Sequence, residues 1–174
     1  MTASFLAEAR RLLEKHYLPR IAQCLKQLGE EDLWWRPNPA SNSAGNLTLH
    51  LAGNVRQWIV SGLGGKPDLR DRSREFDERG PMPARLLFAR LRKAVQEACT
   101  VLSGLGSAEL HTVYAIQKHR VTGFQAVSHV TDHFAYHSGQ IAFITKLRLG
   151  QDLGFTRLPG AAAPGPKRRR LSAV

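Results

Sequence analysis

Apolar residues recur at three- and four-residue steps in four long stretches of the chain, and this period is typical of amphipathic α-helices. The stretches cover approximately residues 4–29, 43–63, 83–103 and 122–149, and glycine lies at or just after the end of each. Pro19 falls inside the first stretch and predicts a kink or a local break there. Helices that each have one apolar face predict an all-α protein, folded as an antiparallel four-helix bundle.

The connections between these stretches differ in character. Residues 30–46 contain two tryptophans and two prolines and predict a structured connection. Residues 66–82 are polar, alternate in the sign of their charge and are bounded by prolines, so we expect a surface loop. Residues 107–121 predict an irregular segment with one short extended piece at 111–116. The sequence Thr122-Gly-Phe-Gln125 predicts a capping box at the start of the last helix.

The length of 174 residues suits one domain, which we place at residues 1–150. Residues 151–174 contain glycine, proline, alanine and a basic cluster without an apolar period, and they predict a flexible, disordered basic tail. No apolar run approaches the ~20 residues that span a bilayer. Glu8 and Arg10 interrupt the N-terminal stretch where a signal peptide stays apolar. We therefore expect a cytoplasmic protein that has no membrane partner.

The net charge of +11 raises the question of a nucleic-acid partner. Part of this charge lies in the tail, where Arg157 and the run Lys167–Arg170 outnumber Asp152. The rest is spread along the helix faces and one loop, and no basic stripe is interleaved with aromatic residues. This distribution favours general solvation, so we expect no nucleic-acid partner.

Three histidines follow one another at four-residue steps in the last predicted helix: His129, His133 and His137. Such positions lie on successive turns of one helix face, where two imidazoles can bind one ion from the same side. Because a turn has 3.6 residues, successive four-residue steps drift around the helix, and one of the three should point away from the ion. We expect His129 to be that residue, with the pair His129 and His133 as the alternative.

Two histidines leave a metal site incomplete, and His50 in the second predicted helix is the candidate third ligand. A single histidine on an apolar face is more often a hydrogen-bonded core residue, and the spacing of His133 and His137 is what favours a metal. Imidazoles suit zinc, nickel, iron or copper better than calcium or magnesium. Three of them leave at least one coordination position open, which is typical of catalytic sites.

Four polar residues beside these histidines are candidates for orienting an imidazole or positioning a substrate. Asn54 follows His50 by one helical turn, and Tyr136 and Gln140 form a stripe next to the histidines of the last helix. His129 is the fourth candidate, as a hydrogen-bonding neighbour of the metal ligands.

These residues together resemble the DinB-like superfamily of metal-dependent enzymes, which includes the mycothiol- and bacillithiol-dependent S-transferases. The resemblance covers roughly residues 5–150. Its most specific parts are the motifs Leu49-His50-Leu51 and His133-x3-His137-Ser-Gly-Gln. The chain has Tyr136 where many members have the first histidine of a doublet, and its loop at residues 64–76 resembles an uncharacterised branch of the superfamily.

The resemblance implies that His50, His133 and His137 bind a divalent metal, zinc or nickel, and that His129 lies outside this set. It also implies a homodimer and a low-molecular-weight thiol as a second cofactor. We therefore expect a metal-dependent thiol S-transferase or hydrolase that acts on a small-molecule substrate. The alternative is a non-enzymatic, dimeric stress-response or binding scaffold in which the metal is structural.

Overall fold

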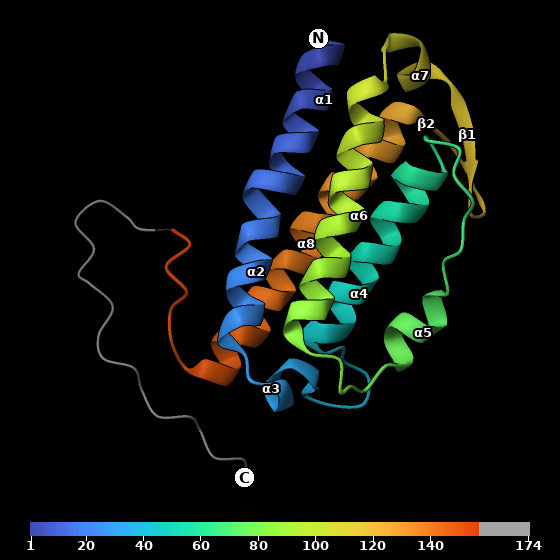
Figure 1. Ribbon diagram of the computed structural model, residues 1–174. Helices are drawn as coiled ribbons and strands as arrows, with labels where there is room; N and C mark the ends of the chain where they lie inside the picture. The colour runs from blue at the N-terminus through green and yellow to red at the C-terminus, as the bar shows by residue number, and fades with distance from the viewer. Residues whose placement is uncertain (157–174) are drawn as a thin grey trace.

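The structure of the protein, a computed structural model, describes residues 1–156 and is mostly helical (Figure 1). The long helices are α1 (Thr2–Arg11), α2 (Leu18–Gln27), α4 (Ala44–Val55), α6 (Ala84–Gly104) and α8 (Gly123–Leu149). Two π-helical segments continue them, η1 (Leu12–Tyr17) between α1 and α2 and η2 (Arg56–Ser61) after α4. The shorter elements are α3 (Glu30–Trp34), α5 (Arg72–Asp77), α7 (Ser107–His111), β1 (Val113–Ile116) and β2 (His119–Thr122).

Caps confirm the predicted starts of α4 and α8 and the predicted end of α8. The Ser43 hydroxyl accepts a hydrogen bond from the Asn46 amide at the start of α4, and the Asn46 side chain accepts one in return from the Ser43 amide. Thr122 and Gln125 form the predicted capping box at the start of α8. Gly150 ends α8 in the left-handed conformation, with φ of 62°, which glycine adopts without a Cβ penalty.

Pro19 neither breaks nor ends the first helical stretch. It lies in the first turn of α2, directly after the π-helical segment η1. A proline ring interferes with the carbonyl of the preceding turn and removes one amide donor. The wider π-helical turn before it offers a place where this irregularity is absorbed. The chain therefore continues as a helix from α1 through α2.

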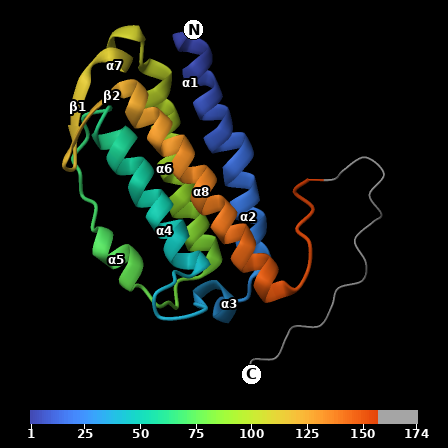
Figure 2. The same cartoon turned by 180° about the vertical axis from the view of Figure 1, so that it is seen from behind.

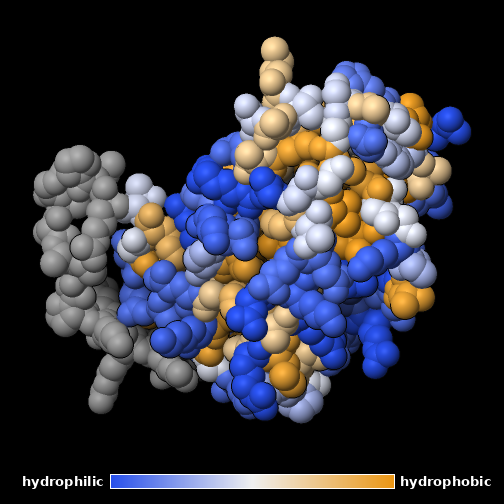
Figure 3. Space-filling view, turned by 45° about the horizontal axis from the view of Figure 1, so that its top comes forward, coloured by the Kyte–Doolittle hydropathy of each residue, from blue (hydrophilic) through white to orange (hydrophobic). Residues whose placement is uncertain are grey.

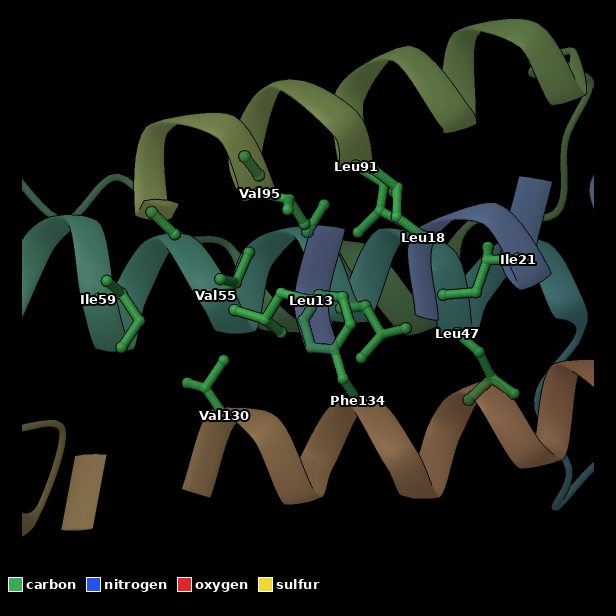
Figure 4. Close-up of a cluster of buried hydrophobic side chains, with 14 of the residues drawn as sticks. Leu13, Leu18, Ile21, Leu47, Val55, Ile59, Leu91, Val95, Val130 and Phe134 are labelled. Carbon is green, nitrogen blue, oxygen red and sulfur yellow. The ribbon is translucent and has the colours of Figure 1, made fainter. Parts of the chain in front are cut away.

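The long helices contact one another around a single apolar core. α4 packs against α6 and α8, and α2 packs against the same two helices (Figures 1 and 2). Figure 4 shows side chains from all of these helices pointing toward one another. Phe134, on α8, reaches into the middle of this cluster and is fully buried. Burial of these apolar side chains is the main term that stabilises the arrangement.

The direction of the helices differs from the predicted antiparallel order. α4 runs antiparallel to α8 but parallel to its other neighbour, α6 (Figure 1). Parallel neighbours need a connection that returns along the length of the helix, so residues 62–83 run back beside α4. This connection was predicted as a surface loop, yet it carries α5, which packs on α4 and buries Glu75.

The predicted irregular segment before α8 is ordered. After α7, strands β1 and β2 form an antiparallel hairpin in which Val113 pairs with Thr122 and Ile116 with His119. β1 lies inside the short extended piece predicted at 111–116, whereas β2 was not predicted, because none of its residues is buried and no apolar alternation marks it. Figure 3 looks toward this end of the molecule and shows apolar residues gathered between polar ones.

Residues 151–156 follow α8 and pack on the helices, with Leu153 buried and its carbonyl accepting a hydrogen bond from Gln23 Nε2 at 2.6 Å. The remainder of the predicted basic tail, including Lys167–Arg170, lies outside the described residues. Within residues 1–156, no helix combines the length and apolar character that crossing a bilayer requires.

Candidate metal centre

Three histidines from two helices meet where α4 packs on α8. His50 comes from α4, and His133 and His137 come from successive turns of α8. Each of the three imidazole rings offers one nitrogen, and these three nitrogens all lie within 4.8 Å of one another. The Nε2 atoms of His50 and His133 are 2.8 Å apart, and a contact this short needs a proton or a cation between the two nitrogens. The structure therefore brings together the residues that the sequence singled out.

Burial favours the neutral form of His133 and His137. Loss of solvent around His133, together with the neighbouring His137 and His50, lowers the pKa of His133 to about 3. Burial also lowers the pKa of His137, while its hydrogen bond with Gln140 opposes that shift. Neutral imidazole is the form that has a lone pair available for a metal. The site therefore needs no deprotonation of these two rings at pH 7 before it can bind a cation.

The Nδ1 atoms of two of the histidines are engaged away from the centre. His137 Nδ1 donates to Gln140 Oε1 at 2.7 Å, and His50 Nδ1 lies 3.0 Å from Glu75 Oε2. Carbonyl and carboxylate oxygens can only accept, so these contacts favour a proton on each Nδ1 and a lone pair on each Nε2. Histidine ligands of metals usually donate their second N–H to such an oxygen. The donor set of this site fits a divalent transition metal.

Glu75 is the residue of this site that the sequence analysis missed. Its carboxylate is buried and is held by Arg70, with Arg70 Nε 2.7 Å from Oε1 and Nη2 2.7 Å from Oε2. Both residues lie in the segment that was predicted as a surface loop. The one available signal was Asp71, which caps α5 by accepting from the Arg74 amide. A short helix could have been predicted from that cap, but the burial of its glutamate could not.

His129 lies beside the three histidines and outside their group. Its ring packs on Trp58, with ring centroids 4.0 Å apart, and its Nε2 lies 3.5 Å from Asn54 Nδ2. The centroid of the His133 ring is 5.3 Å away. The helical drift expected from the sequence is consistent with this position. Asn54 is buried one turn after His50 on α4, so both residues extend the polar face of the site.

Tyr136 and Gln140 lie on the other side of the centre. Gln140 touches the site directly through His137 Nδ1. The Tyr136 ring meets the His137 ring edge-on at 5.0 Å, while its side chain is 63% exposed. The aromatic ring of Phe76 covers the opposite side of His50, with ring centroids 4.7 Å apart. Phe76 and Glu75 thus cover His50, and His133 is the one of the three histidines that is only partly buried.

Comparisons with known proteins place this chain in a family. The DUF1572 family, described as proteins of unknown function, matches residues 1–159. No curated protein matches the chain. A solved structure with a similar fold is a conserved protein from Enterococcus faecalis, with a TM-score of 0.69 and 20% identity over 80% of this chain and 94% of that one.

Two further similar structures carry the DinB-like name. A DinB-like protein from Bacillus cereus ATCC 10987 gives a TM-score of 0.59 and 18% identity over 76% of this chain and 85% of its own. A DinB-like protein from Bacillus subtilis gives 0.59 and 13% identity over 82% and 90%. At such identities the similarity shows the fold and not the chemistry. The chain belongs to the DUF1572 family, and its fold is that of the DinB-like superfamily, as the histidine motifs predicted.

Proposed function

We propose that this protein is a DinB-like four-helix bundle that binds one divalent metal ion, zinc or nickel, through His50, His133 and His137. The observation that carries the proposal is the convergence of three imidazole nitrogens within 4.8 Å of one another. The hydrogen bonds at the Nδ1 atoms of His50 and His137 support it, because they leave Nε2 of each ring free. Imidazole is a ligand that both metals favour.

We further propose that the bound metal serves a thiol S-transferase or hydrolase reaction on a small electrophilic or amide-like substrate. A divalent metal with an open coordination position lowers the pKa of a water or of a low-molecular-weight thiol bound there. The protein's own part is to bind and orient the substrate. The candidates for this role are Asn54 and His129, which contact the histidine cluster on one side, and Tyr136, which contacts it on the other.

The alternative is a non-enzymatic dimeric scaffold in which the metal is structural. A homodimer is supported by a groove of about 580 Å³ beside α8, which the exposed side chains of Tyr136, Phe143 and Leu147 line. Under this alternative, chelation lowers the melting temperature, and neither thiol transfer nor hydrolysis is detected with any substrate. Under the enzymatic proposal, the metal-loaded protein turns over a thiol or hydrolase substrate, and His133→Ala does not.

The metal content of the purified protein tests the proposal. We expect stoichiometric zinc or nickel in the wild-type protein and its loss in His133→Ala, because two imidazoles on separate helices do not complete a site. His111→Ala is the matched control, since His111 is exposed on α7 and should leave the metal content unchanged. Full occupancy in His133→Ala would contradict the proposed ligand set.

A further inference from the structure

We propose that Glu75, held in place by Arg70, is a positioning residue that fixes the tautomer of His50 and thereby sets the metal affinity of the site. This inference rests on the proposed metal-binding function and extends it to residues outside the histidine motifs. Glu75 Oε2 lies 3.0 Å from His50 Nδ1, and both side chains are almost fully buried. A buried contact of this kind is strong because little water competes for it.

The contact selects one of two protonation patterns for His50. With the proton on Nδ1, His50 donates to Glu75 and its Nε2 lone pair faces His133 and His137. With the proton on Nε2, the Nδ1 lone pair faces the negatively charged Glu75 carboxylate at 3.0 Å, which is repulsive. Arg70 Nη2, 3.1 Å from Nδ1, carries two N–H groups, and one of them donates to Glu75 Oε2 at 2.7 Å. Because Oε2 and Nδ1 are only 3.0 Å apart, the second N–H, which diverges widely from the first, is poorly directed toward Nδ1. The Nδ1–H form is therefore favoured.

Arg70 orients the carboxylate of Glu75. Its Nε and Nη2 bind the two oxygens of Glu75 as a bidentate pair, a geometry that fixes the plane of the carboxylate. The remaining nitrogen of the guanidinium, Nη1, donates to Oε1 of Gln57 at 2.8 Å, and this bond holds the guanidinium against η2. The charge on Glu75 is thus compensated in the buried site before any cation binds there.

Glu75 lies on the connection at residues 62–83, which runs back beside α4 before α6 begins. The carbonyls of Glu75 and Glu78 each accept from Asn46 Nδ2 at 2.9 Å, which anchors the connection to the start of α4. Close approach of the carboxylate also requires Gly53 on α4. A Cβ at Gly53 would lie 1.8 Å from Glu75 Oε1 and 2.9 Å from Arg70 Nε, so one of these groups would have to move.

The experiment compares the full-length wild-type protein with Glu75→Gln and Gly53→Ala. Glu75→Gln keeps the shape of the side chain and one accepting oxygen, and Gly53→Ala displaces the carboxylate while leaving its chemistry intact. Glu78→Gln, in the same connection, and Gly104→Ala, where a Cβ meets nothing within 4 Å, are the matched controls. Circular dichroism verifies that each variant is folded.

Two readouts are taken. In metal-free protein, two-bond ¹H–¹⁵N correlation spectra should show His50 protonated on Nδ1 in the wild type and controls, and a loss of that preference in the two test variants. The affinity for Zn²⁺, measured by competition with a chromophoric chelator, should fall about 10- to 100-fold in the test variants, the usual effect of removing a group that orients a metal-binding histidine.

Wild-type tautomer and wild-type zinc affinity in both test variants would overturn the inference. Absence of zinc binding in the wild-type protein would contradict the proposed metal function instead. The tautomer comparison uses no metal, so it decides whether Glu75 orients His50 whether or not the wild-type protein binds zinc. The two failures are therefore distinguishable.

Discussion

Replacement of Asn46 by alanine should detach the connection that carries Glu75. The Asn46 side chain is fully buried and donates to the carbonyls of Glu75 and Glu78 at 2.9 Å and to that of Phe76 at 3.4 Å. Its Oδ1 accepts from Arg36 Nη2 at 2.8 Å. The same Oδ1 also completes the cap of α4. One side chain thus joins the helix that bears His50 to the segment that orients His50.

The expected loss follows from these contacts. Removing the cap hydroxyl with Ser43→Ala should cost about 1 kcal/mol, the usual value for a helix N-cap. Asn46→Ala loses its part of that cap, the two short bonds from its Nδ2 to the connection and the bond that its Oδ1 accepts from Arg36, each worth about 0.5–1.5 kcal/mol net. We therefore expect Asn46→Ala to cost about 3–4 kcal/mol in the free energy of unfolding. For a chain of this size this corresponds to a melting temperature about 6–16 °C lower.

Urea unfolding and amide hydrogen exchange test this prediction together. Asn46→Ala should be less stable than Ser43→Ala by about 2–3 kcal/mol, and exchange should be faster in α5 than in the wild type. The exchange in α6 should change only as much as the global stability does. Equal destabilisation in the two variants, with unchanged exchange in α5, would refute the idea that Asn46 anchors the connection.

Two further predictions concern protonation and packing. Metal-free protein should lose stability as the pH falls from about 6.5 toward 3, because His133 takes up a proton in the unfolded chain near its ordinary pKa but in the folded protein only near pH 3. The stability that neutral, buried His133 contributes is therefore fully present above pH 6.5. Urea unfolding in the presence of a chelator should show a weaker pH dependence for His133→Gln than for the wild type. Phe134→Ala should cost about 3–5 kcal/mol in urea unfolding because it leaves a cavity in the core, whereas Leu69→Ala, at a side chain that is 89% exposed, should change stability little.

The helices could be predicted from sequence because their signals are local. Apolar residues at helical spacing and the caps at Ser43 and Thr122 depend on residues a few positions apart. The clustering of His133 with His137 depends on the same period, and so does the exclusion of His129. The meeting of His50 with this pair depends on the packing of two helices. The sequence indicated His50 as the candidate third ligand because two histidines leave a metal site incomplete, and the family resemblance implied the same set.

The connection at 62–83 could not be predicted because its structure depends on contacts distant in sequence. Glutamate and arginine are rarely buried, so Arg70 and Glu75 read as solvent-facing residues. Their burial becomes favourable only when each pairs with the other and with His50. The parallel direction of α4 and α6 likewise follows from packing, since the apolar period of a helix does not encode its direction.

Binding of a metal by the three histidines can be measured most directly by anomalous scattering from crystals of the purified protein, recorded above and below the zinc and nickel absorption edges. We expect one anomalous peak at about 2.0–2.1 Å from the Nε2 atoms of His50, His133 and His137, with His50 Nδ1 donating to Glu75. A peak bound by His129 and His133 without His50, or no peak in protein supplied with both metals, would contradict it.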